Sequence, residues 1–528
     1  EANIGSLDAR LDTAEANIIT LDGRLDVAEP EIDALQAFDT ALATSTGSTS
    51  IGFLQTGTGA TLRTVQSKLR DVVSVKDFGA VGNGVANDTA AFIAAHAALP
   101  ASGGAIYVPA GNYNVNATVA FTKPIYMYGD GGALSVGASR ILCNTPSIDV
   151  FTTTNILSCY NFAIQGQTTN TLFKQLNTAT NHAGTSFSNL AVLNCYRFFE
   201  SQASLVFTVR NCWIGGFVDA GICINNGAGT FGDQGDSYIV NNAFISGGAS
   251  SAAIDVIRGA GFWISGNKFN ASVGIAHLRL NVTEATGNIL VENNSFEGQP
   301  TYAIEASSAF TVTKLVATGN QFSGGVSRHI NLTGNVFEAV IANNTFNGLS
   351  STPASPETGI YVGDLPRDVT IQGNNFHKID GCITLLDSSA KILDNTFGDD
   401  VARYVTGTIK DVFNFRQSYS RHYLSRYIEN TSNSVWKTIY KITGVSVTLE
   451  IMIEGFVQGV GALQAYYKTF NGANVVTPIV TGAGASAFSF QITAGGEIQF
   501  RLNGSVGTNA QITPRIVAVG GIANVTFT

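Results

Sequence analysis

Three acidic residues are the first candidates for chemistry. Asp233 and Asp236 lie in the glycine-rich stretch GAGTFGDQGDS, and Glu200 lies 33 residues before Asp233. Hydrolysis of a glycosidic bond commonly uses two carboxyl groups, one protonated to assist the leaving oxygen and one ionised. We therefore predict Glu200, Asp233 and Asp236 as catalytic residues. The alternative is that Asp233 and Asp236 only solvate and turn a loop.

Other polar and aromatic side chains could contact a carbohydrate, by stacking on sugar rings or pairing with sugar carboxylates. The predicted substrate-binding residues are Gln234, Arg258, Trp263, His277 and Arg279. His277 with Arg279 or Tyr238 could instead serve a lyase, which needs a base and neutralisation of a uronate carboxylate. Further acidic candidates are Asp255, Glu292, Glu297, Glu305 and Asp364.

A repeat predicts the scaffold that positions these residues. Between residues 161 and 397, Asn followed by an aromatic or large apolar residue returns ten times, at intervals of some 21 to 31 residues. One coil of a parallel β-helix, with three short strands and three turns, needs about that many residues. Stacking the coils would place each Asn above the last at a turn and each Phe in an interior column. The returns are Asn161-Phe162, Asn189-Leu190, Asn211-Cys-Trp213, Asn242-Ala-Phe244, Asn267-Lys-Phe269, Asn294-Ser-Phe296, Asn320-Gln-Phe322, Asn344-Thr-Phe346, Asn375-Phe376 and Asn395-Thr-Phe397.

Composition and charge limit the class of protein. The 528 residues are 45% hydrophobic and 13% charged, so the chain can bury a large core, and the 57 Gly suit many tight turns. A net charge of −9 without a basic run disfavours nucleic acid as a partner, and no apolar stretch is long enough for a membrane helix. The six scattered Cys are predicted to be small core residues of a protein made in a reducing cytoplasm, without disulfide or metal roles.

The N-terminal segment has an unbroken heptad pattern. Apolar residues alternate spacings of three and four from Ile4 to Leu35, which predicts a coiled coil over residues 1–37. Ile and Leu at these positions permit a trimer without fixing the number of strands, and Pro30, Gly5 and Gly23 weaken the helix. Residues 38–72 are predicted to be a neck. Because the chain begins at Glu1 rather than Met, we expect a further segment upstream.

The following junction predicts how the body begins. We expect a strand over Val73 to Phe78, an N-cap at Asp88 and Thr89, a helix over Ala90 to Ala98 that closes the end of the β-helix, and a strand over Gly103 to Asn112. The motifs of this junction are LRDVVSVKDFGAVGNG, NDTAA and VPAGNY. They closely resemble those of phage tailspike proteins within the pectate-lyase-like superfamily.

The resemblance implies an all-β chain: a homotrimer of right-handed parallel β-helices over residues 73–425, followed by a C-terminal β-sandwich over residues 426–528 for trimerisation or glycan binding. It also implies a virion protein that joins the phage tail or baseplate through its N-terminal side. Such a protein would bind bacterial capsule, exopolysaccharide or O-antigen and cut it by endo-glycosidic hydrolysis, without a cofactor or metal. Glu200, Asp233 and Asp236 are similar to the Glu plus Asp-x-x-Asp arrangement of some tailspike endoglycosidases. A lyase and a non-catalytic adhesin are the alternatives.

Overall fold

The computed structural model describes residues 2–132, 137–176, 182–202, 204–225, 236–271, 274–298, 300–324, 327–348, 357–388 and 390–397, and after these only the backbone of the strands named below. The chain divides into two compact units, Glu1–Val73 and Ser74–Thr528. None of the described helices has both the length and the hydropathy of a membrane span.

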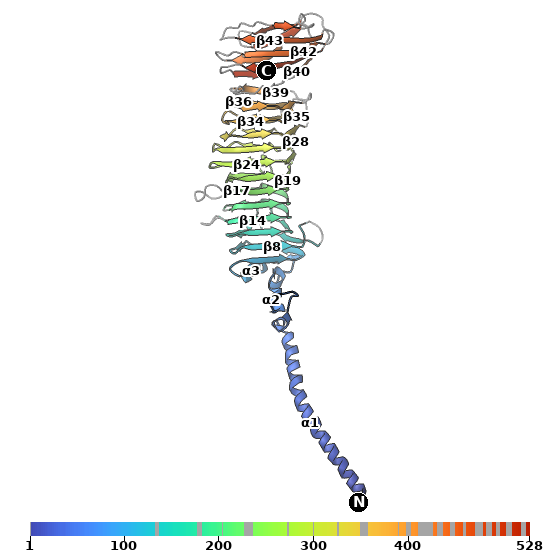
Figure 1. Cartoon of the computed structure of the whole chain (residues 1–528). Helices are drawn as coiled ribbons and strands as arrows, with labels where there is room; N and C mark the ends of the chain where they lie inside the picture. The colour runs from blue at the N-terminus through green and yellow to red at the C-terminus, as the bar shows by residue number, and fades with distance from the viewer. Residues whose placement is uncertain are drawn as a thin grey trace. The chain divides into compact units, whose positions relative to one another are not determined.

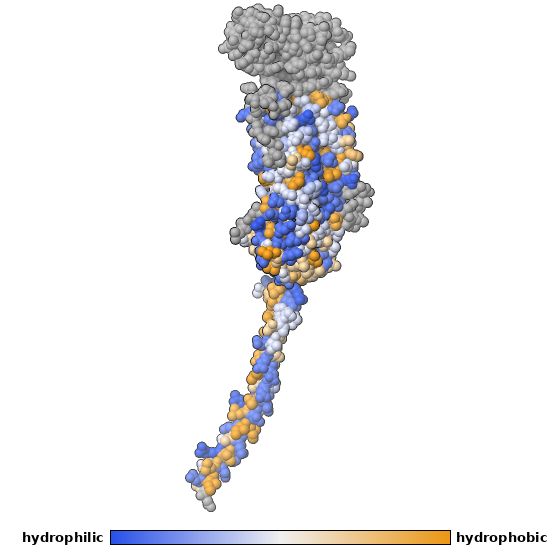
Figure 2. All heavy atoms as spheres, turned by 180° about the vertical axis from the view of Figure 1, so that it is seen from behind, coloured by the Kyte–Doolittle hydropathy of each residue, from blue (hydrophilic) through white to orange (hydrophobic). Residues whose placement is uncertain are grey.

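One long helix dominates the first unit. Helix α1 (Ala2–Leu42) continues through Pro30 and past the predicted end at residue 37, and it buries no residue. Its heptad positions are exposed, for example Leu11 at 60% and Ile18 at 63%, and Figure 2 shows hydrophobic side chains along the whole helix. A helix with an apolar seam gains little from folding alone. The unit also contains a short 3₁₀ helix (Gly47–Thr49), β1 (Gly52–Phe53), β2 (Arg63–Thr64) and α2 (Val65–Leu69).

The second unit is a parallel β-helix, as predicted, in which the chain visits three parallel sheets in turn. Figure 1 shows the strands stacked from β8 to β39. Sheet 1 contains β5 (Gly104–Val108), β8 (Ile125–Gly129), β11 (Leu157–Tyr160), β14 (His182–Ser188), β16 (Ser204–Arg210), β18 (Ser237–Val240), β21 (Phe262–Ser265), β24 (Thr286–Glu292), β27 (Val312–Thr318), β30 (Val336–Phe337), β31 (Val340–Ala342), β34 (Val369–Gln372) and β37 (Ala390–Leu393), and begins at β3 (Val73–Ser74).

Sheets 2 and 3 share the long strands β15 (Ala191–Ser201) and β17 (Trp213–Asn225), which run through both. Sheet 2 also contains β4 (Asn83–Asn87), β6 (Gly111–Asn114), β9 (Ser139–Leu142), β12 (Ala163–Gln165), β19 (Ala243–Gly247), β22 (Lys268–Ala271), β25 (Ser295–Gly298), β28 (Gln321–Ser323), β32 (Thr345–Asn347), β35 (Asn375–His377) and β38 (Thr396–Phe397). Sheet 3 also contains β7 (Val119–Phe121), β10 (Asp149–Thr153), β13 (Thr171–Gln175), β20 (Ala252–Arg258), β23 (Ala276–Leu280), β26 (Tyr302–Ala306), β29 (Arg328–Leu332), β33 (Thr358–Val362), β36 (Gly381–Ser388) and β39 (Arg403–Ile409).

A ladder of buried asparagines holds the corner between sheets 1 and 2. Asn320, 1% exposed, accepts hydrogen bonds from the backbone and side-chain nitrogens of Asn294 and donates to Val291 O and to Asn344 Oδ1. The same pattern links Asn242, Asn267, Asn294, Asn320, Asn344, Asn374 and Asn395. These bonds satisfy backbone groups that no sheet pairs at a corner, so the ladder fixes the register of successive coils.

The predicted alignment of all ten asparagines is wrong at four returns. Three of these asparagines occupy the position one residue before that of the ladder. They are Asn161, Asn189 and Asn211, where φ is 61°, 54° and 53°. Asn tolerates this left-handed conformation, so these residues serve the turn itself. At the ninth return the ladder uses Asn374 rather than Asn375.

Stacked phenylalanines fill the interior behind the ladder, as predicted. Phe244, Phe269, Phe296, Phe322, Phe346 and Phe376 stack with centroid distances of 4.7 to 5.0 Å and interplanar angles of 3 to 7°. This spacing equals the separation of neighbouring strands, about 4.8 Å. The prediction that the six cysteines are core residues is also confirmed, since all six are buried free thiols.

The helix predicted at the end of the β-helix is present as α3 (Thr89–Ala98), with Phe92 fully buried. Asp88 does not cap it; its carboxylate accepts hydrogen bonds from the backbone of Val81 and Gly82 and so holds the glycine-rich turn. The predicted strand over Val73 to Phe78 is wrong after Ser74. Residues Val75–Phe78 form a 3₁₀ helix because Ser74 and Asp77 make a capping box.

After β38 the described strands are antiparallel apart from the pairing of β39 with β36. One sheet contains β40 (Arg426–Glu429), β42 (Leu449–Val457), β43 (Gly461–Thr469), β44 (Ile479–Thr481) and β47 (Asn509–Ala518), and the other strands are β41 (Lys437–Thr443), β45 (Phe488–Ile492), β46 (Glu497–Leu502) and β48 (Asn524–Phe527). The packing of these sheets into a sandwich stays a prediction.

The ladder predicts a large stability effect from one amide. Asn320→Ala removes four hydrogen bonds and leaves buried donors of Asn294 without a partner, which costs about 2 to 4 kcal/mol. We expect a lower Tm, measured by circular dichroism. Asn347→Ala, on the exposed outer side of sheet 2, is the matched control, and an equal loss in both variants would contradict the structural role of the ladder.

Candidate active site

Sheet 3 carries a row of polar side chains on its outer face. In β20, Ile254 and Val256 are fully buried in the core, so Asp255 between them points outward. The parallel register places one residue from each strand in this row. We call it the sheet-3 column, which consists of Lys174, Glu200, Cys223, Asp255, Arg279, Glu305, Asn331, Tyr361 and Thr384.

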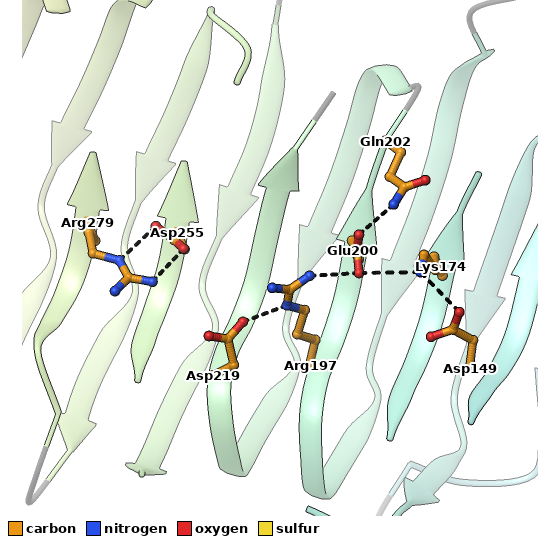
Figure 3. A network of polar contacts seen from close by, with 8 residues as sticks. All are labelled: Asp149, Lys174, Arg197, Glu200, Gln202, Asp219, Asp255 and Arg279. Atoms are coloured by element: carbon orange, nitrogen blue, oxygen red, sulfur yellow. Dashed lines mark hydrogen bonds and ion pairs between the residues drawn. The ribbon is translucent and has the colours of Figure 1, made fainter. Parts of the chain in front are cut away.

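Glu200 lies at the centre of a charged network shown in Figure 3. It is 4% exposed, and its Oε2 is 2.8 Å from Nη1 of Arg197 and 3.9 Å from Nζ of Lys174. Gln202 donates to its other oxygen, at 2.6 Å. Arg197 also pairs with Asp219 at 2.6 Å. Both carboxylate oxygens are therefore occupied by protein donors, which offsets the cost of burying the charge.

Asp255 is held by a two-pronged ion pair. Arg279, the next residue of the column, donates from Nε to Oδ1 at 2.9 Å and from Nη2 to Oδ2 at 2.6 Å. The Asp255 side chain is 2% exposed and that of Arg279 is 15% exposed. Bidentate, charge-assisted bonds of this kind orient a carboxylate and compensate its burial.

Glu305, the next member of the column, is in a different environment. Burial raises the pKa of its carboxyl group, Asp255 adds to the increase, and a hydrogen bond from Ser307 and the charge of Arg279 oppose it. Glu305 is half-buried and has no ion pair among the residues that the structure describes. The column thus holds a carboxyl group with a raised pKa two strands from a carboxylate bound by a guanidinium, a combination that suits acid–base catalysis.

The other predicted substrate-binding residues are divided between sheets. Arg258 ends β20 of sheet 3 and donates from Nε to Thr283 Oγ1 at 2.9 Å. Trp263 lies on the outer face of sheet 1, 43% exposed, with its Nε1 donating to Glu292 at 2.8 Å. Of the predicted site residues, the structure thus places Glu200 and Arg279 in one column and Trp263 on another sheet.

His277 lies where a sugar cannot reach it, which corrects its prediction as a substrate-binding residue or a lyase base. The ring is 1% exposed and packs between Phe269 and Phe296 inside the β-helix. Burial lowers the pKa of His277 to about 4, a hydrogen bond with Glu297 O opposes the decrease, and His329 adds to it. His277 follows the bend at which the chain passes from sheet 2 into sheet 3. At this bend its side chain points into the β-helix and not out of the sheet.

The structure describes only part of the glycine-rich stretch. Asp233 and Gln234 lie outside the described residues. Asp236 is exposed, has a left-handed φ of 64°, and directly precedes β18 of sheet 1. Glu200, by contrast, lies on sheet 3.

Sequence reasoning missed several members of the network, including Arg197, Asp219, Lys174 and Asp149, which binds Lys174 at 3.1 Å. A signal was present. Asp255, Arg279, Glu305 and Asn331 follow one another at intervals of 24, 26 and 26 residues, one coil apart, so aligning coils on their outward positions would have shown the column.

Among the residues that the structure describes, no group of three or more His, Cys, Asp or Glu side chains is arranged to hold a metal ion. Cys223 lies in the column between Glu200 and Asp255, but burial raises the pKa of its thiol to about 12. It therefore stays protonated and is a poor nucleophile or ligand.

Part of this chain matches known protein sequences. A family model described as rhamnogalacturonase A/epimerase, pectate lyase-like, matches residues 72–299. The mannuronan C5-epimerases AlgE5 and AlgE2 of Azotobacter vinelandii are each 59% identical to this chain over 44 residues, 8% of this chain and 4% of each epimerase. The chain thus matches only a small part of the length of these relatives.

Solved structures with a similar course of the chain include the following three. A mutant of DFA-IIIase from Arthrobacter chlorophenolicus A6 in complex with DFA-III has a TM-score of 0.47 and 12% identity, covering 62% of this chain and 98% of that one. A double mutant of the tailspike protein of E. coli bacteriophage HK620 has 0.45 and 12%, covering 93% and 99%. The surface adhesin PfbA of Streptococcus pneumoniae has 0.37 and 17%, covering 64% and 99%.

The buried His277 predicts a pH dependence of stability. Its pKa is lowered from the usual 6.5 to about 4 in the folded protein, so only the unfolded chain takes up a proton between these pH values. Stability is fully present above pH 6.5 and falls on acidification, by on the order of 3 kcal/mol from this group. Urea denaturation of wild type and His277→Gln at pH 7 and pH 4.5 measures the difference, and equal losses in both proteins would refute it.

Proposed function

We propose that the protein is a homotrimeric phage tailspike that binds a bacterial surface polysaccharide and cuts it by endo-glycosidic hydrolysis on the outer face of sheet 3. The observation that carries the proposal is the pair of carboxyl groups, Asp255 and Glu305, in different electrostatic environments on one outward row. The tailspike-like junction and the carbohydrate-active enzymes for which the matching family model is named support the same class of function.

Each carboxyl group has its own role in this proposal. Glu305, with its raised pKa, would protonate the leaving glycosidic oxygen, and the Asp255 carboxylate, oriented by Arg279, would activate water. The two residues lie two strands apart, about 9 to 10 Å between Cα atoms at a strand spacing of about 4.8 Å.

Asp233, Asp236 and Glu200 remain a second proposal for the catalytic residues of the same reaction. Glu200 lies two strands from Asp255 in the column, with Cys223 between them. Arg197 and Gln202 engage its two oxygens, as Arg279 engages both oxygens of Asp255. In the first proposal Asp255 is preferred because Glu305, whose pKa is raised, lies two strands away on the other side. The loop that contains Asp233 follows β17 and precedes β18.

The catalytic prediction concerns Glu305 and Asp255. Glu305→Gln and Asp255→Asn each should lower the hydrolysis rate at least about 100-fold, because acid–base catalysis contributes about 10²- to 10⁴-fold, and trimer and polymer binding should remain. The assay follows chain length, reducing ends and ultraviolet absorbance with the surface polysaccharide of a susceptible host. Wild-type activity should fall as the pH rises through the raised pKa of Glu305, because the general acid then loses its proton.

Controls in the same assay separate the alternatives. Asp233→Asn with Asp236→Asn should leave cleavage largely intact if sheet 3 is the site; the reverse pattern moves catalysis to the loop. An ultraviolet-absorbing unsaturated product would identify a lyase. Binding without any shortening of the polymer would identify an adhesin.

The second prediction concerns the trimer. Helix α1 leaves its heptad seam exposed, so partner helices would have to cover it. Protein comprising residues 1–528 should sediment as three chains of 55.4 kDa, and Leu11→Asp with Leu25→Asp should weaken association, because a charge in the seam must be desolvated. Asn17→Asp, outside the seam, is the control. A wild-type monomer, or a double variant as tightly associated as the control, would contradict the proposal.

A further inference from the structure

Arg328 on sheet 3 is placed like Arg197, but the residue that it contacts is an amide and not an acid. In β15, Arg197 reaches the column residue three positions later, Glu200, at 2.8 Å. In β29, Arg328 reaches the column residue three positions later, Asn331, at 2.6 Å. The register places Arg328 in the row of Arg197, and Asn331 in the row of Glu200. The same arrangement therefore occurs twice, with a neutral amide in place of the carboxylate the second time.

This replacement leaves a positive charge uncompensated. The guanidinium carbon of Arg328 lies 3.5 Å from the centroid of the Tyr361 ring, so the side chain is held by stacking and by its Nη1 bond to the buried Asn331. Arg328 has no carboxylate partner among the residues that the structure describes, whereas Lys174, Arg197 and Arg279 on the same sheet are all paired with acids. Nε and Nη2, the edge that binds a carboxylate through two parallel bonds, make no bond there.

The position of this charge relates it to the proposed acid. Asn331 pairs with Glu305 in the register, so Arg328 belongs to the strand that directly follows the one with Glu305. Neither the ion pairs nor the causes of the raised pKa of Glu305 include Arg328, so the carboxyl group does not neutralise it. A sugar unit bound next to a bond cut at Glu305 would lie beside this guanidinium.

We propose that Arg328, Asn331 and Tyr361 form a subsite for the carboxylate of an acidic sugar, so that the polysaccharide bound on sheet 3 contains uronate-like units. Stacking on Tyr361 presents the guanidinium in one orientation at little entropic cost. Asn331 keeps the site free, because an acid there would occupy Arg328 itself. The inference depends on the proposed function where it concerns cleavage. Binding of the polymer can be measured separately and does not depend on it.

The test compares the native surface polysaccharide of a susceptible host with the same polymer after carbodiimide activation and borohydride reduction of its carboxyl groups. Wild type should cut and retain the native polymer better, by about 10- to 100-fold in kcat/KM and in affinity, the range for a charge-assisted contact. Arg328→Gln should lose this preference. Asn331→Asp, an isosteric change that supplies the missing acid, should lose it too. Lys391→Gln, on sheet 1, removes the same charge elsewhere and should behave as wild type.

The outcomes separate the subsite from the activity. If wild type hydrolyses the native and the reduced polymer equally well, the subsite is refuted and the proposed hydrolase activity is retained. Retention that prefers the native polymer and depends on Arg328, without cleavage by any protein, would support the subsite and overturn the hydrolase. Retention that depends on Arg328 but not on carboxyl reduction would assign the site to phosphate or sulfate and refute the carboxylate.

Discussion

The in-register stacking of coils at the asparagine corner is the constraint on which the rest of this structure depends. Each ladder amide binds the coil before it and the coil after it, so a coil cannot slide by one residue without leaving buried donors and acceptors unpaired. Once the corner is fixed, the side-chain alternation of every following strand is fixed as well. Phenylalanines therefore stack inside sheet 2, and polar residues align outside sheet 3.

Alignment has an electrostatic consequence on the outer face. Residues separated by 24 to 26 positions come within one strand spacing of each other, so a row without alternating charge would repel itself. The sheet-3 column alternates Lys174 with Glu200 and Asp255 with Arg279, and it uses the uncharged thiol of Cys223 between two acids. Glu305 has no ion pair among the described residues, and burial, with a smaller contribution from Asp255, raises the pKa of its carboxyl group.

The β-helix is a rigid scaffold, and the charges of the sheet-3 column are less completely paired at Glu305. This arrangement would suit acid–base chemistry on a long polymer. The ion pairs around Asp255 restrict side-chain motion without a loop that must close. The row continues beyond Glu305 to Asn331 and Tyr361, so successive sugar units of a bound chain would meet successive coils. Arg328, stacked on Tyr361 without an acid, lies along that continuation.

The local patterns of the sequence determined the repeat, and the tertiary structure decided which residues share a face. Spacing of Asn and Phe predicts a parallel β-helix, because both residue types have one useful place in a coil, at a turn and in the core. It does not separate Asn161, at a left-handed position, from Asn242, in the ladder, since the two positions differ by one residue. Glu200 and Arg279 are recognisable as polar candidates. The pairing of Arg279 with Asp255 comes from the register of stacked strands, whereas Arg197 reaches Glu200 from three residues earlier on the same strand. The sequence predicts His277 as a site residue, but its side chain lies in the core. Whether a side chain at a bend points inward or outward depends on backbone geometry that no local pattern encodes.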